Sequence, residues 1–127
     1  MSDSAKRAQG RAMFEKVMGF APPRLEGDLF LEATTDHLFA DVWVRPGLGV
    51  RERRLVTLTV LACLGNELTL RLHLGAALKS GDLTDAELDE LVLHVAHYAG
   101  WPCAAVASGV LRALRAERAK PREGDPR

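Results

Sequence analysis

The sequence lacks an excess of charge of either sign. Lysine and arginine together number 17, and aspartate and glutamate also number 17, so the formal net charge is zero. A protein that binds nucleic acid generally carries a basic excess, because contacts to phosphate supply much of its affinity. The composition therefore argues against a general nucleic-acid binder, although local basic patches remain at residues 51–54 and 112–122.

Cysteine is scarce as well. The two cysteines, Cys63 and Cys103, form neither a Cys-x-x-Cys pair nor a zinc-binding spacing. Both stand among apolar residues, so we expect each to be a small buried hydrophobic residue. Spacing alone leaves open whether the two could pair in a disulfide, because that depends on geometry.

Long apolar runs are also missing. No segment approaches the ~20 apolar residues of a membrane-spanning helix, and no secretory hydrophobic region follows the polar residues 1–10. We therefore expect a soluble cytoplasmic protein without a membrane partner. The 127 residues suit one domain, residues 1–127, and the 47% hydrophobic content is typical of a globular chain. So small a domain leaves apolar surface uncovered, which favours self-association.

Sustained strand alternation is absent, and almost every segment has the helical period. Thr84 and Glu87 have the spacing of a capping box at a helix start. The third predicted helix is charged at its start and then nearly all apolar, which predicts a central or an interface position. We predict an all-α bundle of about six helices and a disordered tail at 120–127, with helices over residues 4–18, 28–44, 50–64, 67–79, 85–99 and 102–119.

A single histidine, His73, lies in the otherwise apolar fourth helix. Histidine exchanges a proton near neutral pH, so His73 is a candidate proton carrier. Taken alone, its surroundings favour a satisfied core or interface histidine. Glu67 lies six residues earlier and therefore on another face of the helix. It is either an acid favoured by the helix dipole or an acid that orients or protonates a ligand.

Three arginines, Arg51, Arg53 and Arg54, cluster at the start of the third helix. The helix dipole disfavours cations at that end, so compensating carboxylates are expected nearby. Arginine suits bidentate carboxylate binding. Both substrate binding and salt bridges across subunits therefore remain open for these side chains.

The fifth helix carries Glu90, His94 and His97 on one stripe. Such a stripe could hold a metal ion, but any polar helix face produces it, and we predict no metal site. His94 or Tyr98 could instead line a pocket. Trp43 lies near the end of the second predicted helix, shortly before Pro46-Gly47. A tryptophan there is expected to anchor a core or an interface, with ligand contact as the alternative.

Several short motifs occur in a specific order over about residues 28–115. The motifs are Arg45-Pro46-Gly47-Leu48 with Arg51-x-Arg53, Leu64-Gly65-x-Glu67, Leu70-x-x-His73-Leu74, Gly81-x-Leu83-Thr84-x-x-Glu87, and His94-Val95-Ala96-x-Tyr98-Ala99-Gly100-x-Pro102. Each is weak alone, but their order and spacing together are specific. In this pattern the sequence resembles the carboxymuconolactone decarboxylase family.

The resemblance implies an all-α fold shared with the alkylhydroperoxidase D-like proteins, assembled as a trimer or a hexamer. It also implies a cofactor-free decarboxylase that removes carbon dioxide from a small carboxylated lactone such as 4-carboxymuconolactone, a step in aromatic-compound catabolism. For that reaction we expect Arg51 or Arg53 to hold the carboxylate. We expect His73 to deliver the proton and Glu67 to orient it or act as an acid. The remaining candidates for substrate contact are Trp43, His94 and Tyr98.

The peroxidase branch of the same superfamily carries Cys-x-x-Cys-x-x-x-His. When its histidine is aligned on His73, its two thiols fall on Asn66 and Thr69, whereas a thiolate is the required nucleophile. Thiol peroxidase activity is therefore disfavoured. His97 stands where the catabolic enzymes are expected to have an apolar residue. A related ring-modifying lyase or isomerase, and a non-catalytic helical oligomer that binds a small molecule or partner, remain alternatives.

Overall fold

The chain is built from helices. The computed structural model describes residues 2–24, 26–121 and 123–124, and no strand occurs among them. The elements are α1 (Asp3–Met18), α2 (Leu29–Ala33), the π-helix η1 (Thr34–Val42), α3 (Val50–Leu64), α4 (Glu67–Ser80), α5 (Asp85–Tyr98) and α6 (Trp101–Ala119). The predicted all-α class is confirmed, and five predicted helices agree with α1 and α3–α6 to within one residue. Residues 122 and 125–127 of the predicted disordered tail lie outside the described residues.

The second predicted helix, residues 28–44, is not a regular α-helix. It is α-helical only in α2, and η1 then winds more widely, ending with the Trp43 amide, which donates to the carbonyl of Leu38 at 3.0 Å. The hydroxyls of Thr34 and Thr35 donate to carbonyls of the preceding turn at 2.7 and 3.2 Å. There they compete with the backbone amides of an ordinary α-helix, which favours the wider turn.

Glycines and a capping box set several helix ends. Gly19, Gly65 and Gly81 follow α1, α3 and α4 with φ of 80°, 66° and 75°, a left-handed conformation that costs glycine little. The predicted capping box opens α5. The Thr84 hydroxyl accepts the Glu87 amide at 3.1 Å, and the Thr84 amide donates to Oε1 of Glu87 at 3.0 Å. This prediction from the sequence is confirmed.

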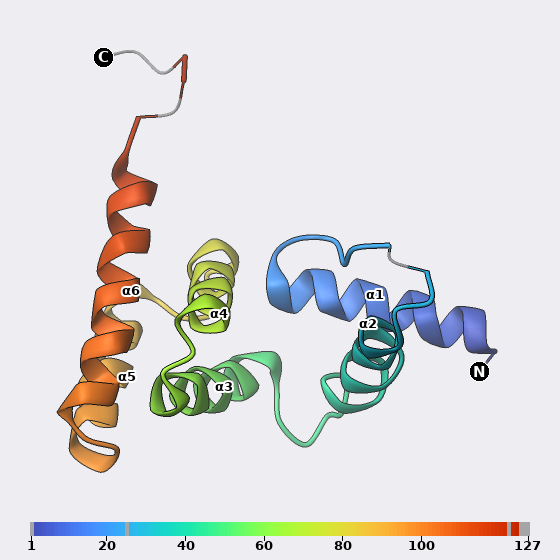
Figure 1. Cartoon of the computed structure of the whole chain (residues 1–127), viewed down its shortest axis with the longest axis horizontal. Coiled ribbons are helices and arrows are strands. Elements are labelled where there is room, and N and C mark those ends of the chain that lie inside the picture. Colours follow the sequence, from blue (N-terminus) through green and yellow to red (C-terminus); the bar gives the residue numbers. More distant parts are fainter. Residues whose placement is uncertain (1, 25, 122, 125–127) are drawn as a thin grey trace.

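Helices α3–α6 enclose the main apolar core (Figure 1), with α5 packed on α6 and α3 packed on α4. Its largest buried members are Leu58, Leu70, Leu74, Leu83 and Leu88. The sequence predicted a central or an interface position for α3, and the two sides of this helix differ in burial. Its core-facing side is buried, but the opposite side exposes several large apolar residues, as described below.

Helices α1 and η1 pack against each other around a second apolar cluster, formed by Phe14, Val17, Phe39 and Trp43. The rings of Phe14 and Phe39 meet edge to face with centroids 5.0 Å apart, and Phe39 stacks on Trp43 at 5.9 Å. In Figure 1 this N-terminal pair lies to one side of the main core, with the end of α1 next to α4.

A buried arginine joins the two parts. Arg54 is 1% exposed, and its Nη1 and Nη2 donate to the carbonyls of Val17 and Lys16 at 2.7 and 3.2 Å. Its Nε donates to the carboxylate of Asp82 at 2.9 Å. Arg54 thus satisfies carbonyls at the end of α1 and pairs with the connection between α4 and α5. Its compensating carboxylate comes from its own chain.

The two cysteines are free thiols, and the Sγ of Cys103 lies 3.9 Å from the carbonyl oxygen of Cys63. Cys103 is partly buried, but Cys63 is exposed. The expectation of burial is therefore wrong for Cys63, because it follows Val56 and Val60 on the outward side of α3.

Within the described residues, no helix combines the length and the apolar character needed to cross a membrane.

Gly10 marks the closest approach of α1 to η1. A Cβ at this position would lie 1.9 Å from the backbone oxygen of Thr35. We predict that Gly10→Ala lowers the free energy of unfolding by about 3 kcal/mol, because the two backbones must separate. Gly109→Ala in α6 is the control, since a Cβ there meets no atom within 4 Å. It should raise stability by about 1 kcal/mol through helix propensity. Urea unfolding followed by circular dichroism measures both, and equal effects would contradict the proposed close approach.

Candidate functional site

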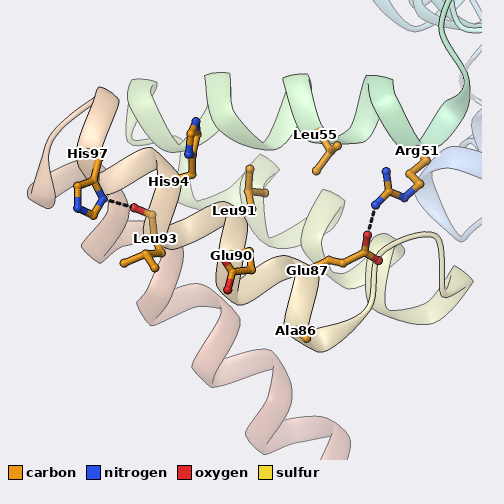
Figure 2. Close-up of a pocket in the computed structure, with 9 residues that line it drawn as sticks. All are labelled: Arg51, Leu55, Ala86, Glu87, Glu90, Leu91, Leu93, His94 and His97. Carbon is orange, nitrogen blue, oxygen red and sulfur yellow. Dashed lines mark hydrogen bonds and ion pairs between the residues drawn. The ribbon is translucent and has the colours of Figure 1, made fainter.

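A groove of 620 Å³ runs between α3 and α5 (Figure 2). The two helices lie side by side along it and run in the same direction, as Figure 2 shows. Helix α3 contributes Arg51 and Leu55 to the lining. The lining residues from α5 are Ala86, Glu87, Glu90, Leu91, Leu93, His94 and His97.

Helical spacing explains which side chains share the groove. Arg51 and Leu55 are one turn apart on α3, while Glu87, Leu91 and His94 follow one another at one-turn intervals on α5. The two leucines occupy the middle, so Arg51 lies at one end and His94 towards the other (Figure 2). Two predicted site residues, Arg51 and His94, therefore line one groove, although they are distant in the sequence.

Arg51 already has a carboxylate partner. Its Nη2 donates to Oε2 of Glu87, whose other oxygen, Oε1, accepts the Thr84 amide of the capping box at 3.0 Å. The side chains of Arg51 and Glu87 are 44% and 38% exposed. An ion pair this exposed contributes about 1 kcal/mol or less. A substrate acid that binds Arg51 would thus have to replace or share the weak ion pair with Glu87.

Aromatic rings gather at the far end of α5. His94 stacks with the predicted site residue Tyr98, with ring centroids 4.8 Å apart, and His97 meets the edge of Trp101 at 5.7 Å. Nδ1 of His97 lies 2.8 Å from the carbonyl oxygen of Leu93. A carbonyl oxygen only accepts, so Nδ1 carries a proton, and Nε2 is the accepting atom of the neutral ring.

Two other predicted residues serve the fold. Arg53 donates from Nε to the carbonyl of Leu48 at 3.2 Å and from Nη2 to that of Arg45 at 3.3 Å, so it fastens the loop that precedes α3. Trp43 is 8% exposed within the second apolar cluster. The structure therefore places neither residue in the groove, and the burial of Trp43 in the second apolar cluster favours the expected role of a core anchor.

His73 is buried in α4 and is 8% exposed. Its Nδ1 is buried and has no hydrogen-bond partner among the described residues. Burial, with a smaller effect from the nearby charge of Arg54, lowers the pKa of His73 from 6.5 to about 4. At neutral pH the ring is therefore uncharged and cannot act as an imidazolium acid.

Glu67 lies apart from His73. It is exposed at the first position of α4 and lines a separate groove of 470 Å³ against α6, together with Leu68 and Arg71. A six-residue separation puts the two side chains on different faces of α4, as the sequence indicates. The structure brings neither residue to Arg51, which lines the groove between α3 and α5.

Reasoning from the sequence missed Glu87 as a site residue. Its spacing from Thr84 identified it only as a helix-start acid, and its partner Arg51 is 36 residues away. The available signal was the helical stripe that Glu87 shares with His94. Within the part of the chain that the structure describes, no three histidine, cysteine or acidic side chains converge as a metal-binding group.

Comparison with known proteins identifies a family that this chain matches. Residues 28–113 match the carboxymuconolactone decarboxylase family. A stretch of 69 residues is 48% identical to the 4-carboxymuconolactone decarboxylase of Acinetobacter baylyi and covers 54% of this chain and 51% of that protein. A stretch of 71 residues is 39% identical to the nitrosuccinic acid decarboxylase of Metarhizium robertsii and covers 56% and 49%. The chain spans about half the length of the curated relatives it matches.

The buried imidazole of His73 should make stability depend on pH. Because its pKa is lowered on folding, its contribution is complete above pH 6.5 and is lost as the pH falls towards about 4. The gap between the two pKa values corresponds to a loss of about 3 kcal/mol. Urea unfolding at several pH values between 7 and about 5 measures most of this loss, before the paired carboxylates contribute strongly. His73→Leu should flatten this dependence, and equal slopes in the wild type and the variant would refute the assignment.

Proposed function

The chain belongs to the carboxymuconolactone decarboxylase family, and we propose that it removes carbon dioxide from a small acid bound in the groove between α3 and α5. The observation that carries the proposal is that Arg51 and His94 line the same groove. Both matched relatives are named as decarboxylases, which supports the reaction type.

Decarboxylation makes three demands on the protein. The substrate must be oriented, the electron pair left by carbon dioxide must be stabilised, and a proton must reach the carbon. Arg51 suits the first task, because a guanidinium can donate two parallel hydrogen bonds to a substrate carboxylate. Leu55 and Leu91 offer apolar contact to the body of the substrate. His94 suits the last task, because histidine exchanges a proton near neutral pH.

We assign the delivery of the proton to His94 and not to His73. With a pKa of about 4, His73 is neutral at pH 7, and it is buried. His94 is exposed at the groove that also holds Arg51. Glu67 is given no contact with the substrate in this proposal, because it lines a different groove.

The relatives suggest the class of substrate. Both 4-carboxymuconolactone and nitrosuccinic acid, the acids named for these proteins, pair a carboxylate with an oxygen-rich group, a lactone or a nitro group. Such a group can take up the electron pair left on carbon, so the substrate itself provides the electron sink. We propose a small acid of this kind, decarboxylated without a cofactor. The alternative is an oligomer that binds such an acid without turnover, which the burial of His73 favours.

An exposed apolar stripe supports the proposed trimer or hexamer. It consists of Val56, Val60 and Leu64 on α3 and Leu68 and Leu72 on α4, which are 57%, 49%, 72%, 74% and 39% exposed. Side chains four residues apart share one face of a helix, so three of the five lie on one side of α3 and two on one side of α4. Exposed apolar faces of this kind often mark interaction sites.

The stripe can be tested by introducing charge. Leu64→Glu combined with Leu68→Glu should convert the assembly into monomers, because burying two carboxylates in an apolar contact is costly. Leu29→Glu in α2 is the matched control, since Leu29 is 79% exposed outside the stripe. Light scattering after size-exclusion chromatography reports the mass. An assembly unchanged by the double substitution would remove the stripe from the interface.

The reaction can be tested by ultraviolet monitoring of 4-carboxymuconolactone and by carbon dioxide release from nitrosuccinate. We predict that Arg51→Gln raises KM about tenfold or more, because a charge-assisted contact to the substrate is lost. His94→Gln should lower kcat by about 10² or more, because the proton donor is lost. Arg112→Gln, an exposed arginine of α6 outside the groove, serves as the control.

His73→Leu separates the two possible proton donors. Our proposal expects a folded variant that keeps most of its turnover. If His73→Leu is folded and inactive while His94→Gln is active, the proton comes from His73 and the groove is not the reaction site. Binding of the acids without turnover in the wild type would establish the non-catalytic alternative.

A further inference from the structure

We propose that Glu87 is a specificity-determining residue, a built-in carboxylate that competes with the substrate for Arg51. This proposal rests on the proposed function in one respect, namely that Arg51 anchors the acid. It adds a role for a side chain that otherwise caps a helix.

The two oxygens of Glu87 have different partners. Oε1 accepts the Thr84 amide at 3.0 Å, which fixes the carboxylate at the first turn of α5. Oε2 accepts Nη2 of Arg51 across the end of the groove. Figure 2 shows the Glu87 side chain reaching from α5 to the guanidinium on α3. The capping box therefore holds a carboxylate in the place where a substrate carboxylate would bind Arg51.

The charges of the groove sharpen this competition. Among its lining residues Arg51 is the permanent cation, whereas Glu87 and Glu90 both carry carboxylates. An acid that binds Arg51 exchanges one carboxylate partner for another and also approaches the charge of Glu87. A carboxylate therefore gains less at Arg51 than it would at an unpaired guanidinium. The leucines and His94 further along the groove can add contacts to an acid that reaches them.

The strength of the competitor follows from its exposure. Both members of the Arg51–Glu87 pair are more than one-third exposed, so water and salt screen their attraction. Such a pair changes the affinity of a competing anion by up to about fivefold. Glu87 therefore lowers the affinity of the groove for acids without preventing them from binding.

Glu87→Gln tests the competitor with little change to the fold, because glutamine also completes a capping box. Isothermal titration with succinate, the parent acid of nitrosuccinate, measures carboxylate binding without requiring turnover. We expect the variant to bind succinate about fivefold more tightly than the wild type. Succinamide, an uncharged ligand of nearly the same shape, should bind both proteins equally.

Two further variants separate the roles of the residues. Thr84→Ala removes the hydroxyl of the cap but keeps the charge of Glu87, so it should lower the melting temperature and leave succinate affinity unchanged. Arg51→Gln should weaken succinate binding about tenfold or more, both alone and together with Glu87→Gln, because the anchor is lost.

The outcomes distinguish the two proposals. If Glu87→Gln leaves succinate affinity unchanged or weakens it while Arg51→Gln weakens binding about tenfold or more, the competitor role is wrong and Arg51 remains the anchor. If Arg51→Gln binds succinate as the wild type does, Arg51 is not the anchor, and both proposals fall. Absence of succinate binding in the wild type and in Glu87→Gln alike also overturns the competitor role.

Discussion

The burial of Arg54 is the constraint on which the rest of the structure depends. A guanidinium that is 1% exposed must have its charge and its donors satisfied, because an unpaired buried charge is far costlier than a missing surface contact. The carbonyls of Lys16 and Val17 and the carboxylate of Asp82 meet this need. They tie the end of α1, the start of α3 and the connection into α5 to one point. The same first turn of α3 carries Arg51 to the groove.

Arg54 also influences which histidine can carry a proton. Burial, with a contribution from its charge, holds the pKa of His73 near 4, so the histidine that the sequence singles out is neutral at physiological pH. His94 lies on the outward side of α5 and stays exposed. The physical difference is between a core position, where desolvation disfavours the charged ring of His73, and a position of His94 that is open to solvent at the groove.

Much of the fold could be predicted from local patterns. The glycines after α1, α3 and α4 and the capping box of α5 act within one or two turns, so their spacing was sufficient. The π-helix η1 was missed, because it involves the hydroxyls of Thr34 and Thr35, which an apolar periodicity does not reveal. The exposure of Cys63 was missed for a similar reason: an apolar helix does not show which of its faces is covered.

The sequence by itself determined the helical class, most helix boundaries, the family pattern and the set of residues able to bind an acid or move a proton. Only the tertiary structure decided how that set is divided. It placed Arg51 beside Glu87 and in one groove with His94. Arg53 and Trp43 stabilise the fold outside this groove. His73 and Glu67 also lie outside it. The reason is that helical periodicity fixes which residues share a face of one helix. Which faces of two helices meet depends on packing between segments that are distant in sequence, here α3 against α5.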